Sequence, residues 1–108
     1  MIALMLPRED LPRLLRPFVD AEGRVTQWPS RMKIQRMAVA LLARGFEPGR
    51  DYTETEVNML LMERNTFADW ALLRRRLYDW RFLDRESDCS RYWVRPGAAE
   101  RIVEELAG

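Results

Sequence analysis

Hydrophobic residues recur at intervals of three and four along three stretches of the chain, which is the spacing of one face of an α-helix. This pattern predicts helices over residues 31–44, 54–63 and 67–80. A helix with one apolar stripe buries that stripe against its neighbours. We therefore expect a three-helix core centred on four leucines, Leu41, Leu60, Leu73 and Leu77.

Polar residues and a glycine mark the ends of these helices. Ser30 is a good N-cap for the first helix, and Gly45 is a good stop. Thr53 and Glu56 have the spacing of a capping box, in which each side chain reaches the other residue's free backbone N–H. Thr66 is the expected N-cap of the third helix.

A β-hairpin is expected after the third helix. Two segments, 82–86 and 91–95, bracket a short polar stretch, and the second is rich in aromatic and β-branched residues, so the hairpin should lie near residues 82–94. A short extended segment is also expected at residues 24–28, before the first helix. The fold class is thus mainly α (α+β), a winged helix-turn-helix with a three-helix core and a β-hairpin wing.

Both ends of the chain add an apolar helical segment. We expect an amino-terminal helical extension over residues 1–22, a winged-helix domain over 23–96 and a carboxy-terminal helix over 97–108, forming a single domain overall. The two segments should pack on each other or across a homodimer through the residues of one face: Leu11, Leu14, Leu15 and Phe18 in the first, and Ala98, Ile102, Val103 and Leu106 in the second.

Composition excludes several classes of functional site but does not point to a particular function. The chain has 108 residues, of which 47% are hydrophobic and 32% charged, a mixture that supports a packed interior. It has no histidine and Cys89 is its only cysteine, which excludes disulfides, histidine bases and His/Cys zinc sites within one chain. We expect no enzyme activity, no metal, no cofactor and no small-molecule substrate.

Hydropathy predicts a cytoplasmic protein with no membrane association. The apolar start, residues 1–6, is too short for a signal sequence and is followed by charged residues. No run of about 18 apolar residues exists elsewhere. The net charge of +1 gives no global signal for a polyanionic partner, so any basic surface must be local.

The densest basic run is Arg74 to Arg76 on the third predicted helix. At about 100° per residue, Arg75 and Tyr78 fall opposite the apolar stripe and Arg74 flanks them. Arginine binds phosphates and guanine edges, so we interpret Arg74, Arg75 and Tyr78, with Arg91 on the hairpin, as contacts to double-stranded DNA. In the alternative interpretation, Arg76 pairs with a carboxylate and its neighbours are only solvated.

Several motifs together resemble a bacterial family, the domain of unknown function 2087 (DUF2087). They are GRVTQWP at residues 23–29, FEPGRDYTETEVN at 46–58, DWALLRRRLYD at 69–79, LDR at 83–85 and YWVR at 92–95. The resemblance implies a winged-helix-like domain that is sometimes attached to helix-turn-helix regulators and is often described as a transcriptional regulator. It implies neither an activity nor a cofactor.

This chain departs from the family pattern in two places. The start of the first main helix, usually rich in Lys and Arg, has only Arg31, Lys33 and Arg36, and the hairpin tip lacks the usual glycine. Two functions remain open. The chain is either a nucleic-acid-binding transcriptional regulator or a protein-interaction module, with a protein partner or a second copy of itself, on a winged-helix scaffold that does not touch DNA.

Overall fold

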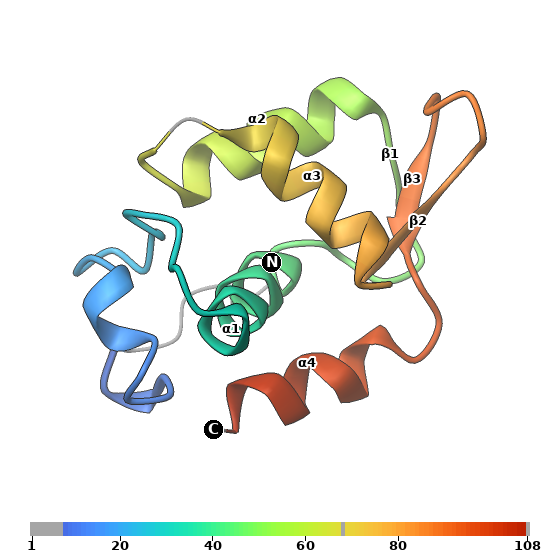
Figure 1. The fold of residues 1–108 in the computed structure, drawn as a ribbon. Helices are drawn as coiled ribbons and strands as arrows, with labels where there is room; N and C mark the ends of the chain where they lie inside the picture. Colours follow the sequence, from blue (N-terminus) through green and yellow to red (C-terminus); the bar gives the residue numbers. More distant parts are fainter. Residues whose placement is uncertain (1–7, 68, 108) are drawn as a thin grey trace.

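A computed structural model describes residues 8–67 and 69–107; residues 1–7 of the predicted extension, with 68 and 108, lie outside the described residues. Its elements confirm the three predicted central helices, the hairpin and the carboxy-terminal helix (Figure 1). The helices are α1 (Met32–Ala43), α2 (Glu54–Arg64), α3 (Trp70–Asp79) and α4 (Ala98–Leu106), and the strands are β1 (Asp51–Tyr52), β2 (Leu83–Arg85) and β3 (Tyr92–Val94).

The strands form one antiparallel sheet in the order β1-β3-β2. Strand β1 pairs Asp51 with Trp93 and lies between the first two predicted helices, where the sequence pattern indicated no strand. Two residues are too few to show a period-two pattern, which explains why β1 was not predicted. The extended segment expected at residues 24–28 is not a strand, since only Val25 pairs, through isolated bridges to Val19 and Asn65.

The amino-terminal segment is not the helix that the sequence predicted. Residues 8–18 contain two short 3-10 turns, Arg8–Asp10 and Arg16–Phe18, in place of one α-helix. Pro12 and Pro17 supply no backbone N–H, so the α-helical hydrogen-bond ladder cannot run through this segment. The side chain of Arg16 instead donates to the carbonyl of Leu11.

Helix ends were predicted correctly where a reciprocal motif marks them. In the confirmed capping box, Thr53 N–H donates to Glu56 Oε1 at 2.8 Å and Glu56 N–H to Thr53 Oγ1 at 3.1 Å. The Ser30 prediction is wrong, because α1 begins after Arg31 without a side-chain cap. Asp69, rather than Thr66, caps α3 through a 3.3 Å hydrogen bond from the Leu72 N–H.

One hydrophobic core holds all these elements together. Figure 1 shows α1 between α4 on one side and the α2 and α3 pair on the other. Leu73 and Leu77 are fully buried and Leu41 nearly so, whereas Leu60 packs at the edge of the core, where Val57 and Leu61 point inward. Both terminal segments join this core, through a set of buried side chains that includes Leu11, Leu15 and Ile102.

No helix within the described ranges 8–67 and 69–107 is long and apolar enough to cross a membrane.

Candidate nucleic-acid interface

Helix α3 presents one face to the core and the opposite face outward. Leu73 and Leu77 are 0% exposed and fix the rotation of the helix about its axis. Ala71 and Arg75 are therefore exposed on the outer side, with Arg74 and Tyr78 half-buried beside them. The structure places these side chains where the helical periodicity predicted them.

Three of the four predicted DNA-contacting residues meet at one hollow. It has a volume of about 280 Å³ and lies between α3, the start of α2 and the hairpin. We call it the α3–hairpin hollow. It is lined by Glu54, Ala71, Arg74, Arg75, Tyr78, Arg85, Cys89 and Tyr92.

The two predicted arginines at this hollow each have an acidic or amide partner within the protein. Arg74 donates to the side-chain oxygen of Asn58 and lies 4.0 Å from a carboxylate oxygen of Glu54. Arg75, with 65% of its side chain exposed, pairs with Asp79 at 3.0 Å. An approaching phosphate must compete with these carboxylates, so the positive charge of this face is largely compensated.

Arg85 supplies the hollow with a cation that the sequence interpretation missed. Its guanidinium lies 4.2 Å from the centre of the Tyr78 ring and donates to Cys89 Sγ at 2.6 Å. Burial alone would lower the pKa of Arg85, but hydrogen bonds involving Tyr78 and Tyr92 raise it above its ordinary value. The guanidinium is therefore firmly charged, and it forms no ion pair within the described part of the chain.

Tyr92 and Cys89 complete the wall of the hollow on the hairpin side. The Tyr92 hydroxyl donates to Glu54 Oε2 at 3.2 Å, and burial, followed by interactions with Cys89 and Glu54, raises the pKa of the phenol. Cys89 has a φ of 64°, the left-handed conformation that glycine usually provides. Cys89 thus occupies a glycine-like position at the hairpin tip.

Arg91, the fourth predicted contact, does not join the other three. It lies on the opposite face of the sheet, with its guanidinium 4.6 Å from the centre of the Trp93 ring. It pairs with Asp51 at 3.1 Å and with Glu86, and the hydrogen bonds that its guanidinium donates to the two carboxylates, Glu86 first, raise the pKa of Arg91. Two carboxylates around one guanidinium leave this corner of the hairpin without net positive charge.

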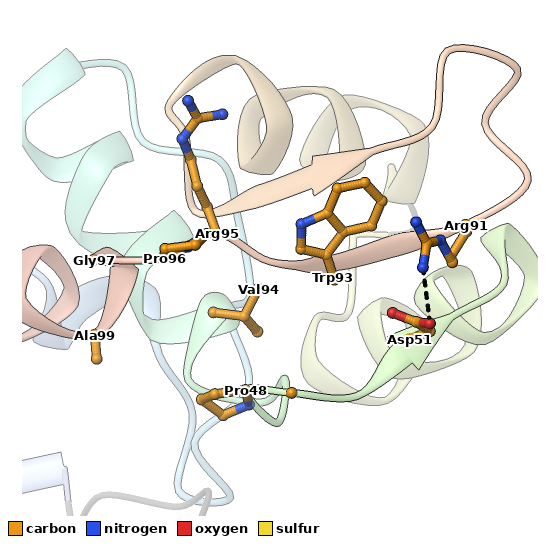
Figure 2. A pocket seen from close by; sticks show the side chains of 10 residues that line it. Pro48, Asp51, Arg91, Trp93, Val94, Arg95, Pro96, Gly97 and Ala99 are labelled. Atoms are coloured by element: carbon orange, nitrogen blue, oxygen red, sulfur yellow. Dashed lines mark hydrogen bonds and ion pairs between the residues drawn. The ribbon is translucent and has the colours of Figure 1, made fainter.

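A second hollow of about 530 Å³ lies on that face, the outer-sheet hollow. Figure 2 shows Trp93 and Val94 above Pro48, with Arg91 reaching Asp51 at one end. Its lining is Pro48, Gly49, Asp51, Arg91, Trp93, Val94, Arg95, Pro96, Gly97 and Ala99. Apolar walls beside a neutralised ion pair suit a protein side chain better than a phosphate.

A second group of arginines gathers around Trp80 on the other side of α3, and the sequence interpretation did not anticipate it. The guanidinium carbons of Arg36 and Arg76 lie 5.1 Å and 5.8 Å from the centre of the Trp80 ring. Arg101 donates to the Trp80 carbonyl at 2.6 Å. Arg76 also pairs with Asp79 at 3.7 Å, which confirms that it has a carboxylate partner.

Within residues 8–67 and 69–107, no group of three or more His, Cys, Asp or Glu side chains is arranged to hold a metal ion.

The family model described as "Uncharacterized protein conserved in bacteria (DUF2087)" matches residues 24–94, which span α1 to β3. No curated protein and no solved structure matches the chain.

Proposed function

We propose that this chain, which belongs to the DUF2087 family of bacterial proteins, is a cytoplasmic winged-helix protein that binds double-stranded DNA as a transcriptional regulator. One observation carries the proposal: the outer face of α3 bears the exposed Arg75 beside a hollow that Arg74 and Arg85 line. A helix presented in this way is the element that helix-turn-helix proteins place in the major groove.

The order of elements supports the winged-helix interpretation. Helices α1, α2 and α3 are followed by the β2-β3 hairpin, and β1, between α1 and α2, pairs with β3 to complete a three-stranded sheet. In such an arrangement α3 corresponds to the recognition helix and the hairpin to the wing.

The contacts would follow from the shape of α3. Ala71 is small enough to let the helix approach a groove, Arg75 and Tyr78 project beside it, and Arg74 and Arg85 flank the hollow. Arg91 stays outside the proposed surface because Asp51 and Glu86 already hold it. Since Arg74 and Arg75 must exchange protein carboxylates for phosphates, we expect weak binding to random duplex DNA, of micromolar order or worse.

The test is the salt dependence of duplex binding, measured by fluorescence anisotropy with a labelled 20-base-pair duplex. Arg75→Ala should reduce the slope of log K against log salt by about one unit, as expected for one lost phosphate contact. Arg13→Ala is the matched control, because Arg13 is exposed and lies in the amino-terminal segment, on the far side of α1 from the hairpin (Figure 1). No duplex binding by the wild type at low salt would refute the proposal.

A protein-interaction module is the second candidate, favoured by exposed apolar surface. Met59 and Met62 on α2 are 57% and 54% exposed, and the outer-sheet hollow has apolar walls. A pull-down from lysate with and without nuclease separates the two candidates. A protein partner or second copy that is retained after nuclease treatment, with no duplex binding by the purified chain, would favour this candidate.

A further inference from the structure

Arg81 ends α3 in a position that normally belongs to glycine. The Arg81 N–H donates to the Tyr78 carbonyl at 3.1 Å and the Phe82 N–H to the Leu77 carbonyl at 3.0 Å, the pair of bonds that defines a Schellman motif. The φ of Arg81 is 66°, which is unfavourable for any residue with a Cβ. Its side chain is exposed, so packing in the core does not offset this cost. Strain of this kind points to a use of the side chain itself.

The surroundings of Arg81 carry more positive charge than the ion pairs of the described residues neutralise. Arg36, Arg76, Arg81 and Arg101 surround or adjoin Trp80, and we call them the Trp80 arginine cluster. Arg76 has Asp79 as a partner, but Arg36, Arg81 and Arg101 form no ion pair with any described residue. This contrasts with Arg74, Arg75 and Arg91, each of which lies beside a carboxylate.

Arg101 is a half-buried member of the Trp80 arginine cluster. One terminal nitrogen holds the Trp80 carbonyl, and the other, Nη2, is buried and has no hydrogen-bond partner among the described residues. Burial and then the positive charges of Arg95 and Arg81 lower the pKa of Arg101 below its ordinary value, although Glu105 and Glu104 act in the opposite direction. The repulsion between like charges held together in a folded protein decreases when an anion binds beside them.

The guanidinium plane matches a phosphate group, to which it can donate two parallel hydrogen bonds. We propose that the Trp80 arginine cluster binds the phosphate backbone of the duplex beside the segment that α3 contacts, with Arg36 and Arg81 as the direct contacts. Trp80 and Arg101 act as positioning residues, because the ring of Trp80 supports Arg36 and Arg101 fixes the Trp80 carbonyl. This inference rests on the proposed function and extends its surface to the other side of α3.

Helix geometry allows one duplex to reach both surfaces. Arg75 and Asp79, the last residue of α3, are four positions apart, or roughly 6 Å along the helix axis at about 1.5 Å per residue, and Arg81 follows two residues later. The major groove of B-form DNA is about 12 Å wide. In the proposed complex, the duplex backbone that borders this groove passes the carboxyl end of α3, near which Arg81 lies.

Arg81→Gly separates binding from folding. Glycine relieves the left-handed conformation at this position, so the variant should unfold at the same or a higher urea concentration than the wild type. It should nevertheless lose about 0.9 units of salt slope in duplex binding, and Arg36→Ala combined with Arg81→Gly should lose about 1.8 units. Arg8→Ala combined with Arg13→Ala removes the same number of charges from the amino-terminal segment and should leave the slope unchanged.

The outcomes distinguish failure of this inference from failure of the proposed function. If the wild type binds the duplex and the Arg36/Arg81 variant keeps its slope, or if the Arg8/Arg13 control loses as much, the cluster is not a phosphate contact although DNA binding stands. If the wild type does not bind the duplex at about 50 mM salt, both proposals fall. Sedimentation of such a protein with vesicles containing phosphatidylserine would assign the cluster to lipid headgroups and likewise overturn the inference.

Discussion

The two sides of α3 differ in how many of their arginines have a carboxylate partner among the described residues: Arg85 is the unpaired one on the hairpin side, and Arg76 the paired one on the other. On the side of the hairpin, Arg74 and Arg75 each lie beside a protein carboxylate. On the side of α1 and α4, Arg36 and Arg81 lie without one within the described residues. Adjacent arginines along the chain therefore say little about surface charge, because tertiary structure decides which guanidinium receives a counter-ion. The hairpin side, which carries the sequence pattern that suggested DNA binding, is the side on which carboxylates neutralise more of the arginine charge.

Leu77→Ala should have the largest effect, because the Leu77 side chain packs α3 into the hydrophobic core and so fixes which residues lie on each of its two sides. The side chain is 0% exposed, and its truncation should cost about 2–5 kcal/mol of unfolding free energy. Urea denaturation followed by circular dichroism measures this. Val103→Ala on α4, where the side chain is 67% exposed, is the matched control and should cost less than about 0.5 kcal/mol. Equal losses in the two variants would show that the rotation of α3 is wrong.

Asp79→Asn should remove the carboxylate that neutralises two of the arginines on α3. Asp79 is the partner of both Arg75, at 3.0 Å, and Arg76, at 3.7 Å, so its neutralisation frees two guanidinium groups. Duplex binding should tighten, and its salt slope should steepen by about one unit. Stability should change little, since Asp79 lies at the carboxyl end of α3, where a negative charge opposes the helix dipole. Unchanged or weaker binding would show that this counter-ion does not limit the affinity.

Asp20→Asn lies outside both sides and should have the smallest effect. Burial alone would raise the pKa of Asp20, but hydrogen bonds from the backbone and side chain of Arg24 and from Glu22 lower it below 3.8. A lowered pKa stabilises the fold at pH values above 3.8, and this contribution is lost as the pH falls through the folded-state pKa.

The variant should be about 0.5–1 kcal/mol less stable than the wild type at pH 7, and the difference should be smaller at about pH 2. Denaturation curves at the two pH values provide the comparison. Duplex binding should be the same for both proteins. A stability difference that is equally large at about pH 2 would mean that the carboxylate charge is not its cause.

The fold was predictable wherever a pattern had enough residues to repeat. Helices α1, α2 and α3 show several turns of apolar spacing, and the reciprocal pair Thr53 and Glu56 marks the start of α2. Strand β1, with two residues, shows no period, and Pro12 and Pro17 prevent the helix that the apolar spacing of residues 8–18 predicted. Leu11 and Leu15 are buried, as that spacing predicted, but Leu14, which was expected on the same packed face, is 43% exposed.

The candidate surfaces were less predictable, because they depend on contacts between distant elements. Helical periodicity placed Arg75 outward, but it could not show that Arg91 would face Asp51, 40 positions away. Arg85 could have been found from the hairpin, since antiparallel register places it opposite Tyr92. Arg81 gave no signal, because its left-handed conformation is normally inferred from a glycine that this sequence lacks at that position.

The most direct test of DNA binding by this face is a titration of the ¹⁵N-labelled chain with a 20-base-pair duplex, followed by two-dimensional NMR. We predict that the largest shifts occur at Arg75 on the outer face of α3 and, on its other side, at Arg36, Arg81 and the Trp80 indole. The hairpin residues Arg91 and Trp93 should move less. Shifts confined to the hairpin and to Met59 and Met62, or no shifts at low salt, would contradict the account.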